Sequence, residues 1–246
     1  MRGLSFHIYK TLLLALCSQS DTMHTNNVKG QSSHMPSRNS LKEYAEDSYY
    51  HVYNRGVEKR IIFLDDDDYT VFLGLLKKYL SGDKKDANTN NRHRFPVIGH
   101  ELQLLAYCLM PNHVHLLFYQ KTRDGLPKLM RRVMTGYAMY FNAKYNRVGS
   151  LFQGRYKASR INAEAYLQHI SRYIHLNPSD YKTWPYSSLV YYGGQKQTPA
   201  WLDTQPILAI FEERRVDYLE FVDQYVDTKR ELDAIKWQLA NNLEDE

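Results

Sequence analysis

The sequence predicts an α+β fold of the split β-α-β, ferredoxin-like type, built on a four-stranded antiparallel sheet. Aromatic and β-branched residues are concentrated in four short segments, which is typical of strands in a half-buried sheet. Two longer segments repeat apolar residues every three to four positions, as amphipathic helices do. From residue 48 the order is β-α-β-β-α-β, followed by one more helix, which carries a tyrosine of interest, and by short C-terminal helices.

The first strand is expected over Ser48–Asn54, where the run SYYHVYN ends before Arg55 and Gly56. Asp65–Asp68 follow, and their carboxylates suit the positive end of a helix dipole better than they suit a metal site. The first helix continues from there with apolar residues at helical spacing, namely Tyr69, Phe72, Leu73, Leu76 and Leu80. Residues 81–94 are polar without periodicity and predict a loop.

A hairpin is expected next, from Glu101–Cys108 and His113–Tyr119, with a break at Met110–Asn112. The second helix covers Leu126–Tyr145 and has Pro127 in its first turn, where the missing N–H costs nothing. A short strand over Arg155–Ile161 completes the sheet. These elements alternate as the split β-α-β order requires.

A further helix is expected over Ala163–Leu176, because Pro178 disfavours helical backbone at the residue before it. Two short amphipathic helices follow, over Trp201–Phe211 and Tyr218–Tyr225. From Trp201 to the end there are twelve acidic and five basic residues. This acidic segment is expected to cover the domain or to mediate dimerisation. A more specific alternative is that it occludes a groove that binds nucleic acid.

The chain divides into three parts: a leader over residues 1–40, a central domain over 48–192 and an acidic helical extension over 193–246. The leader is polar and aperiodic after residue 17, which predicts an unstructured segment. Its apolar run Thr11–Cys17 follows Arg2 and Lys10 and resembles a short signal-peptide core. The alternative is that translation starts at Met35.

Composition excludes several classes of protein. Of the 246 residues, 43% are hydrophobic and 24% charged, which excludes a protein with many membrane spans and a wholly disordered one. Cys17 and Cys108 are the two cysteines, so a disulfide framework and a cysteine-based zinc site are excluded. A reducing compartment, the cytoplasm, is therefore the expected location, without a membrane partner.

Positive charge is concentrated in the middle of the chain. The net charge is +5, yet between residues 121 and 160 ten basic residues face one acid, Asp124. A solvated helix face is one explanation, but so few balancing carboxylates favour a polyanion as partner. The residues expected to contact nucleic acid are Arg131, Arg132, Lys144, Arg147, Arg155, Lys157 and Arg160.

Two small groups of residues have spacings that suit chemistry. His113 and His115 alternate on a strand, so both imidazoles lie on one face and are placed to share a cation; two hydrogen-bonded structural histidines are the alternative. Tyr173 and Asn177 are four residues apart on a helix, so a phenol and an amide oxygen face the same region. Taken alone, Tyr173 is better explained as a core tyrosine, since the chain has 21 tyrosines.

Four ordered motifs resemble IS200-like transposases, and most closely the branch called REP-associated tyrosine transposases. The motifs are YHVYNRG at residues 50–56, MPNHVHLLF at 110–118, GSLFQGRYKA at 149–158, and YIHLNP at 173–178 followed by WPYSSL at 184–189. Together they cover the chain from about Ser48 to Tyr192.

This resemblance implies a single-tyrosine HUH nuclease with a divalent metal, Mg²⁺ or Mn²⁺. His113 and His115 match the two metal-binding histidines, and Tyr173 matches the nucleophile that forms a 5′-phosphotyrosine intermediate. Asn177 matches the third metal ligand, a position that is Gln in many relatives. Because Asn177 precedes Pro178 at a helix end, His169 is the alternative ligand.

The resemblance also implies a substrate: single-stranded DNA folded into a hairpin, which the enzyme cleaves and rejoins. Relatives include homodimers and monomers, so both states are compatible with it. Two rival functions are a catalytically silent protein that binds DNA hairpins and a metal-dependent hydrolase of small substrates. The intact His113, His115 and Tyr173 argue against the first, and the broad cationic stretch argues against the second.

Overall fold

The structure of the protein is a computed structural model, and it describes residues 44–81, 97–161 and 164–226. The predicted leader over residues 1–40 and most of the predicted loop over 81–94 lie outside the described residues, as does the C-terminal end from 227.

The core of the fold is a four-stranded sheet with the order β2-β3-β1-β4. The strands are β1 (Ser48–Arg55), β2 (Leu102–Met110), β3 (His113–Gln120) and β4 (Lys157–Ile161). All neighbouring pairs are antiparallel, and β1 lies between β3 and β4. The predicted split β-α-β, ferredoxin-like topology is therefore confirmed, with strand ends within about two residues of the expected ones.

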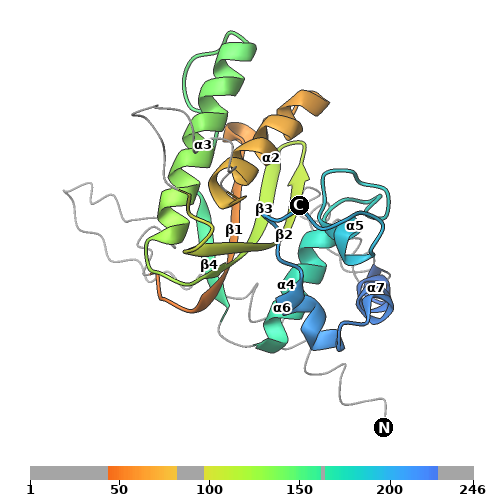
Figure 1. Ribbon diagram of the computed structural model, residues 1–246. Coiled ribbons are helices and arrows are strands. Elements are labelled where there is room, and N and C mark those ends of the chain that lie inside the picture. Colours follow the sequence, from red (N-terminus) through yellow and green to blue (C-terminus); the bar gives the residue numbers. More distant parts are fainter. Residues whose placement is uncertain (1–43, 82–96, 162–163, 227–246) are drawn as a thin grey trace, which may run out of the picture. The chain divides into compact units, whose positions relative to one another are not determined.

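Two helices, α2 (Asp66–Ser81) and α3 (Gly125–Lys144), cover one face of this sheet (Figure 1). The start of α2 is capped as the acidic run predicts, because the Asp68 backbone N–H donates to the Asp65 side chain at 3.1 Å. The Asp68 carboxylate in turn accepts the backbone N–H of Leu64 at 2.7 Å. This reciprocal bonding satisfies backbone donors that the first helical turn leaves without intrahelical partners.

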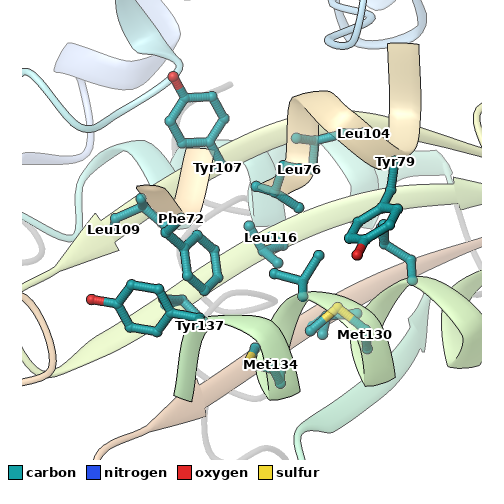
Figure 2. Close-up of a cluster of buried hydrophobic side chains, with 14 of the residues drawn as sticks. Phe72, Leu76, Tyr79, Leu104, Tyr107, Leu109, Leu116, Met130, Met134 and Tyr137 are labelled. Carbon is teal, nitrogen blue, oxygen red and sulfur yellow. The ribbon is translucent and has the colours of Figure 1, made fainter. Parts of the chain in front are cut away.

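The core between these helices and the sheet is built from large apolar side chains (Figure 2). Phe72 from α2 meets Tyr137 from α3 edge-on, while Leu76 from α2 lies near Leu116 of β3, and each of these side chains is fully buried. Burial of one such side chain contributes about 1.5–3 kcal/mol to folding. The helical spacing read from the sequence is thus explained by one shared core.

A bulge in β2 distributes its side chains between two cores. The pairing of β2 with β3 shifts between Leu104 and Ala106, so the alternation of faces restarts after the extra residue. Leu104 and Tyr107 contact the core under α2 and α3, whereas Ala106 and Cys108 contact a second core on the opposite face. Every residue from Leu102 to Leu109 except Gln103 is therefore buried.

The opposite face of the sheet is covered by α4 (Glu164–His175), the helix that carries Tyr173. Three shorter helices follow: α5 (Leu189–Tyr192), which the sequence pattern does not predict, α6 (Gln205–Leu208) and α7 (Arg215–Asp223). The 3₁₀ turn Ala209–Phe211 continues α6, and a second 3₁₀ turn, Val57–Lys59, follows β1. Figure 1 shows α4 together with these helices on the side of the sheet away from α2 and α3.

A buried polar network ties α4 to α7 and to the loop before α5. His175 contacts the Tyr218 hydroxyl through Nδ1 and the Ser188 hydroxyl through Nε2, both at 2.7 Å. Tyr218 also donates to the Ser171 hydroxyl at 3.1 Å. All four side chains are buried. The described part of the C-terminal extension therefore shares a core with the sheet through α4.

Within the described ranges, no helix combines the length and the apolar character that crossing a membrane would require.

Candidate active site

The candidate site lies at the start of β3, immediately after the β2–β3 turn. His113 is the first residue of β3 and His115 lies two residues later, so strand alternation places both side chains on the face that α4 covers. Their ring centroids are 5.0 Å apart and the rings are perpendicular, at 89°. His115 is buried, whereas His113 is half-buried and borders an open cavity.

Asn177 approaches His113 from the other side of the site. It lies two residues beyond the end of α4, where the backbone N–H of Asn177 reaches the Ile174 carbonyl at 3.4 Å in a tightened last turn. The Asn177 side-chain oxygen is 3.0 Å from His113 Nε2. Asn177 thus reaches the histidines from outside the helix, as expected for a residue before Pro178.

His113 has an oxygen beside each ring nitrogen. Asn112 Oδ1 lies 2.6 Å from Nδ1, and Asn177 Oδ1 lies 3.0 Å from Nε2. Burial and the nearby Arg55 lower the pKa of His113, while the Asn177 contact opposes this shift. A neutral imidazole carries one proton and cannot donate to both oxygens. A cation between His113 Nε2 and Asn177 Oδ1 would satisfy both lone pairs.

This donor set fits a divalent metal ion. Within the described residues there is no cluster of three or more His, Cys, Asp or Glu side chains that could hold a metal ion, and the further oxygen that faces His113 is Asn177 Oδ1. Two imidazole nitrogens and an amide oxygen are neutral ligands that suit Mn²⁺ better than Mg²⁺. His113, His115 and Asn177 are the residues that would hold the ion.

Tyr173 lies on α4, and its side chain faces the two histidines of β3. The buried side chains of Leu167 and Ile174 fix this helix on the sheet, which leaves Tyr173 on its margin with 45% of its surface exposed. Its ring meets His115 edge-on, with centroids 5.4 Å apart and an interplanar angle of 86°. The structure therefore brings Tyr173, His113, His115 and Asn177 into one site, all from a single chain.

His169, the alternative ligand, lies elsewhere. Its Nδ1 contacts the Arg172 guanidinium at 3.0 Å and its ring packs beside Phe221 of α7, with centroids 5.5 Å apart. Burial and the Arg172 charge lower the pKa of His169. This histidine belongs to the contact between α4 and α7.

Sequence reasoning missed a third histidine, His51 on β1. His51 Nε2 lies 2.9 Å from His115 Nδ1, and both side chains are buried. Burial lowers the pKa of His51 to about 4, so the ring is neutral at neutral pH. Its presence in the motif YHVYNRG was a signal, but its contact with His115 depends on how β1 pairs with β3.

A cationic cavity of about 640 Å³ borders His113. It is lined by four basic side chains and by no carboxylate: Arg55, Lys59, Arg155 and Lys157. The strand pairing sets Arg55 directly opposite His113, a neighbour relation that sequence spacing cannot reveal. Arg155 and Lys157 were expected to contact nucleic acid, whereas Arg55 and Lys59 were missed.

A second cavity of about 510 Å³ adjoins the first, because Asn54 and Arg155 line both. Its apolar lining comes from Met130, Met134 and Phe152, and its polar rim includes Arg131, Lys128, Thr135 and Asp124. The two cavities, which share these two lining residues, are together called the basic groove, and their combined lining extends from His113 to residues 127–135 of α3.

The other residues expected to contact nucleic acid lie outside both cavities. Lys144 pairs with Asp65 at 2.6 Å and with buried Asp68 at 3.0 Å, so two carboxylates from before and within α2 oppose its charge. Arg132 lies over the Tyr79 ring at 5.6 Å.

Arg147 and Arg160 also lie outside the two cavities. Arg147 donates to the Asn142 side chain at 3.1 Å and lies over Phe141. Arg160 pairs across the sheet with Tyr50, whereas Lys157 pairs with Tyr53, so Arg160 lies on the opposite face of β4 from Lys157. The basic residues of this stretch thus lie in several environments.

An aromatic clamp joins the tyrosine helix to the C-terminal helices. The Arg172 guanidinium is 4.1 Å from the Phe221 ring centroid and 4.2 Å from that of Tyr225, and it donates to the Phe221 carbonyl at 3.3 Å. Arg172 precedes Tyr173, so this clamp holds the helix next to the site. None of the described residues after 192 lines either cavity.

Residues 92–177 match the family described as "Transposase IS200 like". No match was found among curated protein sequences. The match confirms, for residues 92–177, the resemblance to IS200-like transposases on which the site assignment depends.

Two solved structures are similar to part of the chain. One is a REP-associated tyrosine transposase bound to a REP hairpin, with 15% identity and a TM-score of 0.44 over 67% of this chain and 91% of that chain. The other is a putative transposase from Deinococcus radiodurans R1, with 17% identity and a TM-score of 0.34 over 55% of this chain and 94% of that chain.

Proposed function

We propose that this protein, which matches the IS200-like transposases over residues 92–177, is a transposase that cleaves and rejoins single-stranded DNA through Tyr173. One observation carries the proposal. Tyr173 lies edge-on to His115, while Asn177 Oδ1 faces His113 Nε2 at 3.0 Å. A phenol beside two imidazoles and an amide oxygen supplies a nucleophile and metal ligands, which together suit attack on a phosphodiester.

The chemical step is an exchange of one phosphodiester for another. The Tyr173 oxygen loses its proton and forms a bond to phosphorus, and the bond from phosphorus to the 3′ oxygen of the DNA breaks. The products are a 5′-phosphotyrosine and a strand that ends in a 3′-hydroxyl, which takes up a proton. Because one ester replaces another, the reverse attack by a 3′-hydroxyl rejoins the DNA without a nucleotide cofactor.

A divalent ion, when bound by His113, His115 and Asn177, would polarise the scissile phosphate and offset its negative charge. The protein itself positions the reacting groups. The neutral imidazoles add no negative charge that would repel the DNA backbone, and the packing of α4 on the sheet keeps the Tyr173 ring beside His115. Orientation of this kind lowers the entropic cost of reaching the transition state.

The basic groove supports single-stranded DNA as the substrate. Four cationic side chains and no carboxylate line the cavity beside His113, which favours a phosphate backbone over a neutral or cationic ligand. The adjoining cavity has an apolar lining of Met130, Met134 and Phe152, which suits an unstacked base. A DNA hairpin offers both features, because its flanks expose bases that a duplex would hide.

A covalent-adduct assay tests the proposal. We expect the full chain, incubated with a labelled DNA hairpin carrying single-stranded flanks and with Mn²⁺, to form a protein–DNA adduct that survives denaturation. Tyr173→Phe and His113→Ala should abolish the adduct. Tyr166→Phe is the matched control, because Tyr166 is on the same helix and has a similar exposed fraction, 42% against 45%.

Each rival function has its own outcome in this assay. Hairpin binding without any adduct would support the catalytically silent binding protein and would overturn the proposal. Failure to bind the hairpin, together with Mn²⁺-dependent hydrolysis of a small phosphodiester such as bis-p-nitrophenyl phosphate, would support the small-substrate hydrolase. An adduct that persists in Tyr173→Phe would show that another residue is the nucleophile.

A further inference from the structure

We propose that His51 is a positioning residue that keeps the proton of His115 on Nδ1 and so presents His115 Nε2 as a metal ligand. The inference rests on the proposed function, because it concerns the ion that His113, His115 and Asn177 would hold. His51 itself lies behind this set and contacts it through His115.

The geometry places His51 within hydrogen-bond distance of His115. His51 Nε2 lies 2.9 Å from His115 Nδ1, well within hydrogen-bond distance, and both side chains are buried in the sheet face under α4. The strand register sets Tyr53 directly opposite His115, so His51 reaches His115 from the diagonal position on β1. The pair is thus built by two neighbouring strands.

The surrounding rings hold His51 in this orientation. Its ring stacks on Tyr53, with centroids 5.2 Å apart at 28°, and meets the edge of Tyr173 at 5.9 Å and 80°. The imidazole is therefore packed between a neighbour on its own strand and the proposed nucleophile. A side chain so confined fixes the ring to which it is hydrogen-bonded.

The direction of the hydrogen bond decides whether His115 can bind a metal. A neutral imidazole carries one proton, so the nitrogen that bears it cannot also be a ligand. If His115 Nδ1 donates to His51 Nε2, His115 Nε2 is unprotonated and has the lone pair that a metal ligand needs. If the bond runs the other way, the proton is on His115 Nε2 and this ligand position is lost.

His113 provides an internal parallel. Its Nδ1 faces Asn112 Oδ1 at 2.6 Å, and an amide oxygen can only accept, so a neutral His113 that donates its proton to Asn112 turns an unprotonated Nε2 toward Asn177 and the ion. His51 would do for His115 what Asn112 does for His113. Metal-binding histidines generally rely on such a partner, and loss of it typically lowers metal affinity 10–100-fold.

The first test uses the metal-free protein and nitrogen-15 chemical shifts of its histidines, with His115 assigned by comparison with His115→Gln. We expect the wild-type His115 signals to be those of the tautomer with the proton on Nδ1. In His51→Leu this preference should be lost. A wild-type His115 that carries its proton on Nε2 would overturn the inference by itself.

The second test measures Mn²⁺ affinity by calorimetry on the full-length variants without DNA. His51→Leu should weaken Mn²⁺ binding by roughly 10–100-fold. His51→Gln, whose side-chain oxygen can accept the same proton, should stay within about threefold of the wild type. Equal Mn²⁺ affinity in wild type and His51→Leu would contradict the positioning role, as would a failure of His51→Gln to restore affinity.

A control separates positioning from simple loss of stability. His175→Gln alters a buried histidine whose two ring nitrogens contact Tyr218 and Ser188, so it should lower the unfolding midpoint and leave Mn²⁺ affinity unchanged. The outcome is also independent of the proposed reaction. If wild type binds Mn²⁺ with His115 in the expected tautomer but forms no DNA adduct, the transposase proposal fails while the role of His51 stands.

Discussion

Tyr173 and His115 meet edge to face, with ring centroids 5.4 Å apart and an angle of 86° between the rings, although 58 residues separate them in sequence. The contact joins α4 to the centre of the sheet within a single chain. It places the Tyr173 phenol beside the His115 imidazole, which also contacts His51 and Tyr53. All four of these rings belong to the same chain.

Acid should destabilise the protein through its buried histidines. Burial lowers the pKa of His175 to about 3, against about 6.5 in the unfolded chain, so between these pH values the unfolded state binds more protons. The free energy of unfolding therefore falls as the pH drops below 6.5, by about 2 kcal/mol at pH 5 from this group. Urea unfolding at pH 7.5 and pH 5 measures the change.

The control for this prediction is His175→Gln, which removes the titrating group. We expect the variant to be less stable at pH 7.5 but to lose less stability between pH 7.5 and pH 5 than the wild type. His51, whose pKa is lowered to about 4, contributes in the same direction and accounts for part of the remaining dependence. Equal pH dependence in both proteins would refute the assignment to His175.

Neighbouring arginines on α3 should differ in DNA binding. Arg131 lines the cavity that adjoins the site, whereas Arg132 lies over the Tyr79 ring. Arg131→Ala should weaken hairpin binding and reduce the slope of log K against log salt by about one, as expected for one lost phosphate contact. Arg132→Ala should leave the slope unchanged. The measurement is fluorescence anisotropy over a salt series, and equal slopes in the two variants would contradict the proposed groove.

Replacing Lys144 should lower the stability of the protein more than it lowers DNA affinity. Its ammonium pairs with Asp65 and with the buried Asp68, which also accepts a hydrogen bond from Tyr145 at 2.8 Å. Removing the cation leaves a buried carboxylate short of a partner, which is costly. We expect Lys144→Met to lower the thermal unfolding midpoint while hairpin affinity stays within about twofold. A loss of affinity as large as that of Arg131→Ala would place Lys144 in the DNA interface after all.

The Arg172 clamp should support the tyrosine helix. Arg172→Met removes the cation between Phe221 and Tyr225, and cation–π contacts of this kind contribute about 1–2 kcal/mol each where water is excluded. We expect the free energy of unfolding to fall by about 1–3 kcal/mol and adduct formation by Tyr173 to slow. Chemical denaturation and a time course of the adduct check the two effects.

Arg214→Met provides the comparison for Arg172. Arg214 is largely exposed and pairs with Asp217 at 2.8 Å, an exposed ion pair worth less than about 1 kcal/mol. Arg214→Met should change the free energy of unfolding by less than about 1 kcal/mol. It should leave the rate of adduct formation unchanged. If both arginine variants behave alike, the clamp has no special role.

Much of this fold could be predicted because its local signals agree with its topology. The strand His113–Gln120 and the helix with Tyr173 were expected within a residue or two, and strand alternation correctly placed His113 and His115 on one face. Helix α5, four residues long, escaped prediction because so short an element carries no periodicity.

The part of the site that escaped prediction depends on pairing between distant segments. Nothing in the spacing of residues shows that β1 lies beside β3, yet this pairing sets Arg55 opposite His113 and brings His51 to His115. The environment of Lys144 escaped for the same reason, since its counterions belong to the start of another helix. Local charge counts could not reveal them.

Mapping the attachment site of DNA on the protein tests the central claim most directly. Trypsin cleaves after Arg172 and Lys182, so Tyr173 becomes the first residue of a ten-residue peptide that also contains Tyr181. After reaction with a DNA hairpin and Mn²⁺ and nuclease trimming, tandem mass spectrometry should find the nucleotide phosphate on the first residue of this peptide. A phosphate on Tyr181 or on any other residue, or the absence of a covalent adduct, would contradict the account.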